Sequence, residues 1–384
     1  MKILHTSDWH LGRRLHGYPM IEAQAQFLEH LIQVIEEKKI DVLLISGDIF
    51  DRGYNPQLEA QALFDEALNR LSELTTIVGI SGNHDQARRL SFGALIFKRA
   101  GIHLITNLNQ LLEPVVLGEG NDMTAFYGIP FTEPSGVSER LIELGLASSG
   151  DNIPLTDDGV ISVLADAIYK HAQNKKYKNT VVLSHAWFVG AEKERSGSES
   201  DTVGGLGPAK ISTVSRFTYA ALGHLHTPIK LADNVRYSGS PVYYSFTERH
   251  KPKSSWLVEI SDGKAEVDQI LVPTYRNLTE ITGSVAECLS GKYKENKNDF
   301  IKVKLTELEP HASDKLLAYF PYFLTLEPPK IAGGTVDWEK IDSEDPLDVC
   351  CSAFEFNVGT KPSAEQKKLF VEAINVASRD EADD

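Results

Sequence analysis

Asp8-Trp9-His10 is the first of five short polar motifs that decide the fold of this chain. The other four, in order, are Gly47-Asp48, Gly82-Asn83-His84-Asp85, Ser184-His185 and Gly223-His224-Leu225-His226. Together they supply carboxylate, amide and imidazole groups, all of which bind divalent metals. The set is large enough for two metal ions, and two-metal sites are built for phosphoryl chemistry.

Apolar runs of strand length precede the motifs. The shorter Ile3-Leu4 precedes the first motif, and the other four are preceded by Val42-Leu43-Leu44-Ile45, Ile77-Val78-Gly79-Ile80, Val181-Val182-Leu183 and Tyr219-Ala220-Ala221-Leu222. Because Gly, Ser and Asp bound these runs, they predict strands buried on both faces of a sheet. Ligands of open α/β sheets bind at strand ends, so we expect five strand ends to gather the motifs in one crevice.

Each motif alone has an explanation that needs no metal. A single Asp-x-His or Gly-Asp is common in turns, and a lone histidine such as His185 is more often a buried core residue. Gly82-Asn83-His84-Asp85 is more specific, because glycine frees the backbone and three polar groups share a tight turn. Gly223-His224-Leu225-His226 places two imidazoles on one side of an extended segment. The ordered set therefore favours a metal site over independent loops.

The ordered set resembles the calcineurin-like metallophosphoesterase superfamily, whose motifs are Asp-x-His, Gly-Asp-x-x-Asp, Gly-Asn-His-(Asp/Glu), His and Gly-His-x-His. Within it, the chain is similar to the DNA double-strand-break repair nucleases and, among these, to the SbcD family of bacterial nuclease subunits. The segments that carry this resemblance are His5 to Gly12, Ser46 to Asp51, Ala221 to His226, Arg236 to Pro241 and Ser245 to Glu248. The resemblance covers residues 1 to about 260 and is weaker beyond them.

The resemblance implies an α/β fold with a metallophosphoesterase β-sandwich core flanked by helices, a small α+β cap domain and C-terminal helices. It also implies two divalent metal ions with Asp48 as the bridging ligand; Mn²⁺ is the expected ion, although these ligands also suit Fe and Zn. One ion would be held by Asp8, His10, Asp48 and His226, and the other by Asp48, Asn83, His185 and His224. Two aspartates against two divalent cations leave about two net positive charges, which suits an anionic phosphodiester.

Two further residues are implied in catalysis. His84 would stabilise the transition state or protonate the leaving 3′ oxygen, for which a histidine near its ordinary pKa is well suited. Asp51 stands where archaeal and eukaryotic relatives usually have histidine. We expect it to orient His84 through a carboxylate–imidazole hydrogen bond and to raise the pKa of that histidine. Arg52 completes an Asp-Arg-Gly run that protein phosphatases also have, where the arginine contacts phosphate.

The charge of the chain is unusual for an enzyme that acts on DNA. It has 39 Lys and Arg against 54 Asp and Glu, a formal net charge of −15, whereas DNA affinity depends largely on basic residues. Either a partner supplies most of the affinity while a few basic residues act locally, or the substrate is not DNA. The candidates for local phosphate or DNA contacts, with solvated loop charge as the alternative, are Arg13, Arg14, Arg52, Arg88 and Arg89.

The composition indicates an ordinary globular protein. The chain has 384 residues, enough for two or three domains with a sizeable core, and is 42% hydrophobic and 24% charged. We expect no cleavable signal, because Asp8 lies so near the N-terminus, and no run approaches the length of a membrane span. The three cysteines match neither a metal site nor an even disulfide set, which favours a reducing cytoplasm. The resemblance to a DNA nuclease implies in addition that the protein is nucleoid-associated.

The helix and strand patterns divide the chain. Ile21 to Lys38 and Pro56 to Leu74 have helical patterns, and helices between buried strands predict a sheet covered on both faces. Gly190 to Gly207 is rich in Gly, Ser and Glu and predicts a mobile loop, for which a lid over the substrate is the functional alternative. Phe300 to Leu305 alternates like a half-buried strand. We therefore expect a catalytic domain at 1–273, a small α+β cap at 274–342 and C-terminal helices at 343–384. The resemblance implies that the first is a nuclease domain, that the cap helps to select DNA and that the helices dock on an ATPase partner.

Two amphipathic helices are predicted near the C-terminus. Asp345-Pro346 is a helix start with Gly359 as the stop, and Ser363-Ala364-Glu365-Gln366 is a capping box. In the resembled family such helices bind the coiled-coil base of an SMC-like ATPase of the SbcC type. The alternative is that they pack back on their own domain.

The preferred function is a metal-dependent DNA nuclease subunit of an SbcCD-type complex. By resemblance it would degrade double-stranded DNA ends 3′→5′ and cut single strands and hairpins, in repair, recombination and replication-associated hairpin processing. It would act as a homodimer within a heterotetramer. One alternative is a metallophosphatase acting on a phosphoprotein or nucleotide, and another is a non-catalytic scaffold with the same fold. The complete ligand set argues against the scaffold.

Overall fold

A computed structural model describes residues 1–132, 137–148, 156–188, 208–329, 345–358 and 360–380. The predicted loop at 190–207 lies outside these residues. The chain forms two compact units: one is Met1–Glu280 with Glu295–Lys302 and Phe320–Thr325, and the other is Ile281–Lys294, Val303–Tyr319 and Leu326–Asp384. The three-domain division expected from the sequence stays a prediction.

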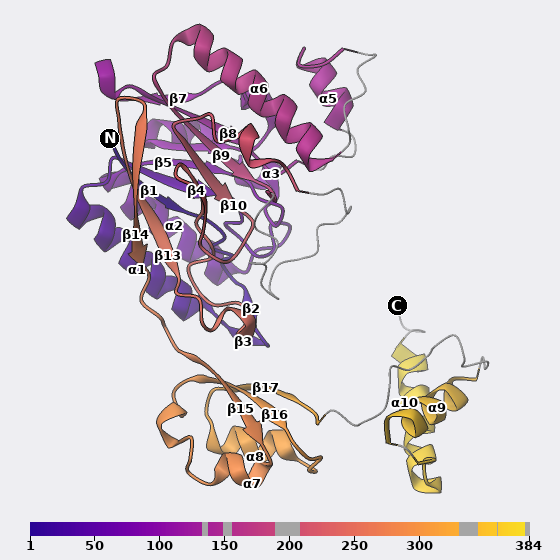
Figure 1. Cartoon of the computed structure of the whole chain (residues 1–384). Coiled ribbons are helices and arrows are strands. Elements are labelled where there is room, and N and C mark those ends of the chain that lie inside the picture. The colour runs from indigo at the N-terminus through magenta and orange to yellow at the C-terminus, as the bar shows by residue number, and fades with distance from the viewer. Residues whose placement is uncertain (133–136, 149–155, 189–207, 330–344, 359, 381–384) are drawn as a thin grey trace. The chain divides into compact units, whose positions relative to one another are not determined.

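Two six-stranded sheets form the larger unit (Figure 1). The first has the order β14 (Lys264–Leu271), β13 (Ser254–Ser261), β1 (Lys2–Thr6), β4 (Val42–Ser46), β5 (Thr76–Ile80) and β6 (Ile102–Ile105). The second has the order β11 (Ile229–Ala232), β12 (Val235–Tyr237), β10 (Tyr219–Gly223), β9 (Asn179–His185), β8 (Thr124–Ile129) and β7 (Val115–Leu117). In the first sheet β1, β4, β5 and β6 are parallel, as β8, β9, β10 and β12 are in the second. All five predicted strands are confirmed.

The two sheets pack face to face through apolar side chains. Val42, Leu44 and Val78 of the first sheet belong to the same buried cluster as Phe126 and Val181 of the second. Each of these residues is fully buried, as apolar side chains on the facing surfaces of two packed sheets are expected to be. The predicted β-sandwich core is therefore confirmed.

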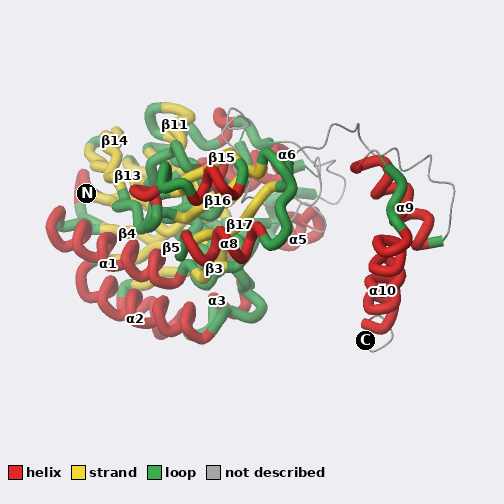
Figure 2. The backbone as a smooth tube through the Cα atoms, turned by 90° about the horizontal axis from the view of Figure 1, so that it is seen from below, coloured by secondary structure: helices red, strands yellow, loops and turns green. Residues whose placement is uncertain are grey.

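Helices cover the outer faces of the sandwich. The first sheet packs against α1 (Ile21–Lys38) and α2 (Leu58–Leu74), which run side by side in Figure 2. The second packs against α5 (Val137–Glu143) and α6 (Asp157–Lys175). Short elements of this region include β2 (Arg14–Leu15), β3 (Tyr18–Pro19), α3 (Ala87–Leu90) and α4 (Ala94–Phe97).

After β14 the chain forms a second set of elements. A three-stranded sheet has the order β15 (Leu278–Gly283), β16 (Phe300–Leu305) and β17 (Phe323–Glu327), and β16 coincides with the predicted strand. Two helices accompany it, α7 (Val285–Leu289) and α8 (Ala312–Tyr319), which pack on each other.

The last two helices begin where their capping residues predict. In α9 (Pro346–Val358) the N–H of Leu347 donates to the Asp345 carboxylate at 2.9 Å. In α10 (Ala364–Asp380) the Ser363 hydroxyl accepts from the N–H of Gln366, whose side chain accepts from Ser363 in return. Across the described residues, every helix falls short of the length and apolar character that crossing a membrane requires.

Candidate metal centre

Backbone hydrogen bonds join the loop after β1 to the loop after β4. The N–H of Asp8 donates to Gly47 O at 3.0 Å, and the N–H of His10 donates to Asp48 O at 2.9 Å. Because both strands are parallel and adjacent, their carboxyl ends deliver Asp8, His10 and Asp48 to one edge. The carboxyl end of β5 lies beside that of β4 in the first sheet. The carboxyl ends of β9 and β10, in the second sheet, bring the remaining motifs to the same place, where His185 Nδ1 lies 2.8 Å from Ser46 O.

Four of the proposed ligands have a left-handed backbone. The φ angles are 53° at Asp8, 44° at His10, 51° at Asp48 and 102° at His224. Residues with side chains rarely adopt this region, and each such position costs about 1–3 kcal/mol unless its surroundings enforce it. The hydrogen bonds between the loops enforce this conformation, and the conformation turns the four polar side chains toward one point.

Two glycines permit the close packing of these loops. A Cβ at Gly82 would lie 2.2 Å from Asp48 Oδ1, and a Cβ at Gly223 would lie 1.9 Å from the backbone oxygen of Ser46. These contacts would involve backbone or ligand atoms that have no room to shift. Glycine is therefore required in both motifs by space.

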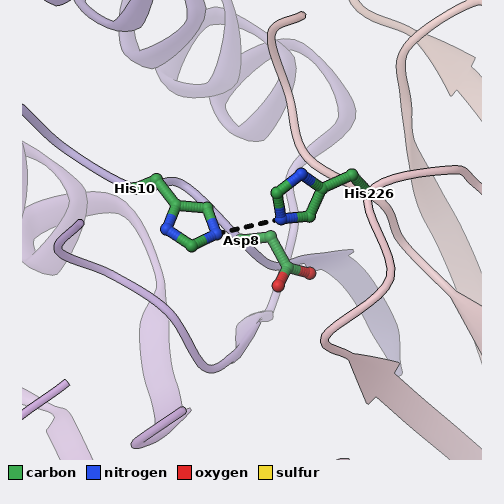
Figure 3. Close-up of side chains that lie close together, drawn as sticks. All are labelled: Asp8, His10 and His226. Atoms are coloured by element: carbon green, nitrogen blue, oxygen red, sulfur yellow. Dashed lines mark hydrogen bonds between the residues drawn. The ribbon is translucent and has the colours of Figure 1, made fainter. Parts of the chain in front are cut away.

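Asp8, His10 and His226 form one side of the centre (Figure 3). The Nε2 atoms of His10 and His226 lie 3.0 Å apart, although 216 positions separate these residues in the chain. The Asp8 carboxylate accepts from Ser7 Oγ at 2.5 Å and from the N–H of His224 at 3.0 Å. All three side chains are buried.

Asp48 lies between this group and the second one. Its Oδ2 is 3.5 Å from His10 Nε2 and 3.4 Å from His185 Nε2. The Oδ1 of Asn83 lies 3.0 Å from His185 Nε2 and 3.1 Å from His224 Nδ1. One carboxylate thus faces both groups, and an amide oxygen joins the two histidines of the second.

The donor set fits divalent cations. His185 Nδ1 donates to Ser46 O at 2.8 Å, so in the neutral ring Nε2 directs a lone pair at the oxygens of Asp48 and Asn83. Acceptors that face one another repel unless a cation lies between them. Burial lowers the pKa of His224 to about 3 and that of His226 to about 4, so both rings are neutral at pH 7 and able to act as ligands.

Two other groups of the centre, Asp8 and His185, have raised pKa values. Burial raises the pKa of Asp8 to about 7. Burial lowers the pKa of His185, but the Asp48 carboxylate outweighs burial and raises it to about 9. A divalent cation would replace these protons as the partner of the two carboxylates.

His84 is held differently from the expectation. Its Nδ1 donates to the backbone oxygen of Asp51 at 2.9 Å, so the predicted bond to the Asp51 carboxylate is wrong. The Oδ1 of Asp51 instead lies 3.7 Å from Arg13 Nε and 3.8 Å from His10 Nδ1. The His84 ring remains at the centre, with its centroid 4.7 Å from that of His10. His84 also belongs to a group with His10 and Asp48 whose ligand atoms lie within 4.8 Å of one another.

The five candidate arginines differ in placement. The Arg13 side chain is only 17% exposed, and its guanidinium lies over the Tyr244 ring at 5.2 Å from the centroid. Arg52 is 79% exposed, and the other three, Arg14, Arg88 and Arg89, are exposed as well. Arg13 therefore lies beside the ligand loops, whereas the other four are surface residues.

The comparison with known families agrees with this geometry. Residues 1–228 match the family described as Calcineurin-like phosphoesterase, over more than half of the chain. The chain belongs to the calcineurin-like phosphoesterase family. Members hydrolyse phosphoester bonds with divalent metals, so the strand-end centre of this phosphoesterase is its candidate active site.

Individual relatives can also be named. The SbcD subunit of nuclease SbcCD from Staphylococcus saprophyticus is 30% identical over 321 residues, which are 83% of this phosphoesterase and 81% of that protein. A solved dimetal phosphatase from Danio rerio is 12% identical, covers 71% of this chain and 99% of its own, and has a TM-score of 0.39. GAP50, the anchor in the inner membrane complex of Plasmodium, is 12% identical with coverages of 71% and 84% and a TM-score of 0.34.

Two polar residues around the phosphoesterase centre have no role predicted from the sequence. Gln24 of α1 donates to His10 O at 2.8 Å and accepts from the N–H of Gly12 at 3.0 Å. Asp85 accepts three backbone N–H groups from Ile49, Phe50 and Gly82. A polar residue on the apolar face of a predicted helix was the available signal for Gln24. For Asp85 it was membership of the third motif.

Glu248 is a further buried acid beside the centre. Its Oε1 lies 3.8 Å from His226 Nδ1, and Oε2 pairs with Lys253 at 2.7 Å. Burial raises the pKa of Glu248, but the Lys253 ammonium outweighs burial and holds it well below the usual range. The sequence signal was its place in the Ser245 to Glu248 segment, to which no role had been assigned.

Proposed function

We propose that this phosphoesterase is a DNA nuclease subunit that works with an SMC-like ATPase of the SbcC type. The observation that carries the proposal is the convergence of the seven proposed ligand side chains in a chain 30% identical, over 83% of its length, to an SbcD nuclease subunit. The proposed reactions are 3′→5′ degradation of double-stranded ends and endonucleolytic cutting of single strands and hairpins. The proposed processes are repair, recombination and replication-associated hairpin removal in the cytoplasm.

The proposed ligand sets divide at Asp48. Asp8, His10 and His226 with Asp48 would hold one ion, and Asn83, His185 and His224 with Asp48 would hold the other. Mn²⁺ is the proposed ion. When bound, such a pair activates water near neutral pH and neutralises charge on the attacked phosphate. The chain's contribution is a fixed, buried set of ligands at strand ends, where the geometry is maintained by the sandwich.

His84 is the proposed proton donor to the leaving 3′ oxygen. The hydrogen bond from Nδ1 to the Asp51 carbonyl fixes the ring and reserves Nε2 for the substrate. The side chain is half-buried, so it can reach a substrate at the edge of the centre. Asp51 would act through Arg13 and His10, because its carboxylate faces both.

A homodimer is the proposed form of the subunit, within a heterotetramer. Large apolar side chains are exposed beside the second and third motifs: Tyr54 at 82%, Leu58 at 83%, Phe92 at 84%, Leu95 at 84% and Ile96 at 71%. Exposed apolar patches of this kind are typical of protein interfaces. A second copy of the chain is the proposed occupant.

The ATPase is proposed to bind α9 and α10. These two helices pack on each other, with the rings of Phe354 and Phe370 at 5.7 Å. Leu369 and Val371 of α10 are 62% and 41% exposed. Apolar side chains exposed on a helix support docking into a groove of a partner. The region 274–342 is proposed to select DNA, and the partner to supply the affinity that a net charge of −15 lacks.

The experiment that tests this function compares two substrates. The purified chain is incubated in Mn²⁺ with an end-labelled DNA duplex and, separately, with a phosphomonoester, each with and without the ATPase. We expect shortening of the duplex from its 3′ ends and much slower turnover of the monoester. Monoester turnover with intact DNA, even when the ATPase is present, would establish the metallophosphatase instead.

A further inference from the structure

A buried ion pair lies directly behind one of the proposed ligands. Glu248 is 0% exposed and follows the loop after β12, and Lys253, 3% exposed, immediately precedes β13. Charged residues of these types are almost never fully buried unless they are paired. Because both charges are buried, they do not contribute to the solubility of the surface, and their place in the fold needs another explanation.

Lys253 uses all three of its N–H groups within this pocket of polar atoms. Its Nζ donates to Glu248 Oε2 at 2.7 Å, to Ser240 Oγ at 2.8 Å and to the backbone oxygen of His226 at 2.8 Å. That backbone oxygen also accepts from the N–H of Ser240 at 3.1 Å. The Lys253 ammonium thus fixes the main chain of His226 as well as the carboxylate of Glu248.

The carboxylate of Glu248 faces the side chain of the same histidine. Its Oε2 accepts from Lys253 and from the N–H of Tyr244 at 3.2 Å, which fixes the carboxylate. Its Oε1 faces His226 Nδ1 at 3.8 Å, on the opposite side of the ring from Nε2. Nε2 is the atom that approaches His10 at 3.0 Å. A proton held on Nδ1 by the carboxylate leaves the lone pair on Nε2.

The stability of the fold gives no reason for such a pair. Replacing a buried ion pair by apolar residues of similar volume is often neutral or stabilising, because the desolvation of both charges disappears. Removing only one partner is strongly destabilising, since the other charge stays buried alone. We therefore explain the ion pair by what it positions, which is one histidine: Lys253 donates to its carbonyl oxygen, and Glu248 faces its ring.

We propose that Glu248 and Lys253 are positioning residues that set the orientation and the tautomer of His226 for metal binding. The inference rests on the proposed metal centre and concerns residues outside its ligand set. Partners that orient a metal-binding histidine typically contribute about 10- to 100-fold to metal affinity.

The test removes both charges at once. In Glu248→Leu/Lys253→Met the apolar volume is kept, so we expect the metal-free protein to melt near the wild-type temperature. Mn²⁺ is titrated into chelator-treated protein and the free ion is followed by its electron paramagnetic resonance signal. We expect the affinity of one ion to fall about 10- to 100-fold, and the rise in melting temperature on adding Mn²⁺ to shrink.

A second ion pair provides the matched control. Asp166 of α6 and Arg216 are 54% and 29% exposed, with Oδ1 and Nη2 2.5 Å apart, and neither adjoins a ligand motif or the Glu248 segment in the chain. Asp166→Asn/Arg216→Met should bind Mn²⁺ as the wild type does. Should the first double variant fail to fold, Glu248→Asp replaces it. The shortened side chain keeps the charge beside Lys253 but withdraws it from His226, and the same weakening of Mn²⁺ binding is expected.

The outcomes separate the inference from the function on which it rests. Wild-type affinity in the double variant, or in Glu248→Asp if that variant is used, overturns the positioning role while the metal centre stands. A wild-type protein that binds no Mn²⁺ overturns the centre and the inference together. Weakened binding in the Glu248 variants alone, with the control unchanged, is the result that the inference requires.

Discussion

At the scale of single residues, Asp48 has the most demanding position. Its Oδ1 accepts from the N–H of His84 at 2.8 Å, while Oδ2 lies within 3.5 Å of His10 and His185. We predict that Asp48→Asn abolishes hydrolysis and lowers the bound metal, because an amide brings no charge to the shared position. Elemental analysis and a cleavage assay measure both effects. Asp262→Asn, at an exposed aspartate, is the control, and full metal content with normal turnover in Asp48→Asn would disprove the role.

His84 should separate catalysis from metal binding. We predict that His84→Ala loses most of its turnover, by about 10²- to 10⁴-fold, which is typical for removal of a general acid. Two ions should remain bound, because the proposed ligand sets do not include this ring. Metal content and turnover measured on the same sample decide the point. Loss of an ion would make His84 a ligand, which its nearness to His10 and Asp48 allows.

The proposed ligands could be predicted from the motifs, whereas the residues that contact and orient the site residues could not. The ligand positions follow from five motifs at strand ends. The partner of His84 does not, because the loop turns the Asp51 carboxylate toward Arg13 and presents its carbonyl to the ring. Glu248 and Lys253 are brought behind His226 by a loop whose conformation depends on tertiary packing. The local sequence does not predict contacts of this kind.

At the scale of elements, the strand ends that form the centre pack so closely that there is no room for a side chain at Gly223. A Cβ at Gly223 would meet the Ser46 carbonyl oxygen at 1.9 Å, so we predict that Gly223→Ala lowers the free energy of unfolding by about 1–3 kcal/mol or more. Denaturant titration measures the change. Gly79→Ala is the control, since its Cβ would meet the movable Leu104 Cδ2 at 3.1 Å. Equal effects in the two variants would contradict the backbone argument.

The elements themselves were largely predictable. β4, β5, β9 and β10 cover the apolar runs, and α1 spans Ile21–Lys38 as its periodicity indicates. The assembly into two sheets was less so. The strand order joins β13 and β14 to the N-terminal strand β1, and such long-range pairing depends on contacts between distant residues rather than on local pattern.

At the scale of the whole molecule, the C-terminal helices are proposed to serve the partner and not the chemistry. We predict that ending the chain after Asp342 leaves cleavage of a short oligonucleotide intact, because every proposed ligand lies before that point. Association with the ATPase should be lost. A pull-down measures binding, and unchanged capture of the ATPase would refute the role of α9 and α10.

The proposed homodimer gives a separate prediction. Phe92→Ser/Leu95→Ser replaces two side chains that are each 84% exposed, so little of the monomer's own stability depends on them. We predict a shift from dimer to monomer in analytical ultracentrifugation, because apolar area would be lost from the interface. Leu271→Ser, at a 60% exposed position on β14, should leave the dimer unchanged. A wild-type chain that is monomeric at all concentrations would contradict the proposal.

The most direct test of the two-metal centre is anomalous diffraction from crystals grown with Mn²⁺. We predict two peaks, about 3.5–4 Å apart as in other two-metal sites. One should lie among Asp8, His10 and His226 and the other among Asn83, His185 and His224, with Asp48 contacting both. A single peak, or a peak coordinated by His84 in place of one of these residues, would contradict the proposed centre.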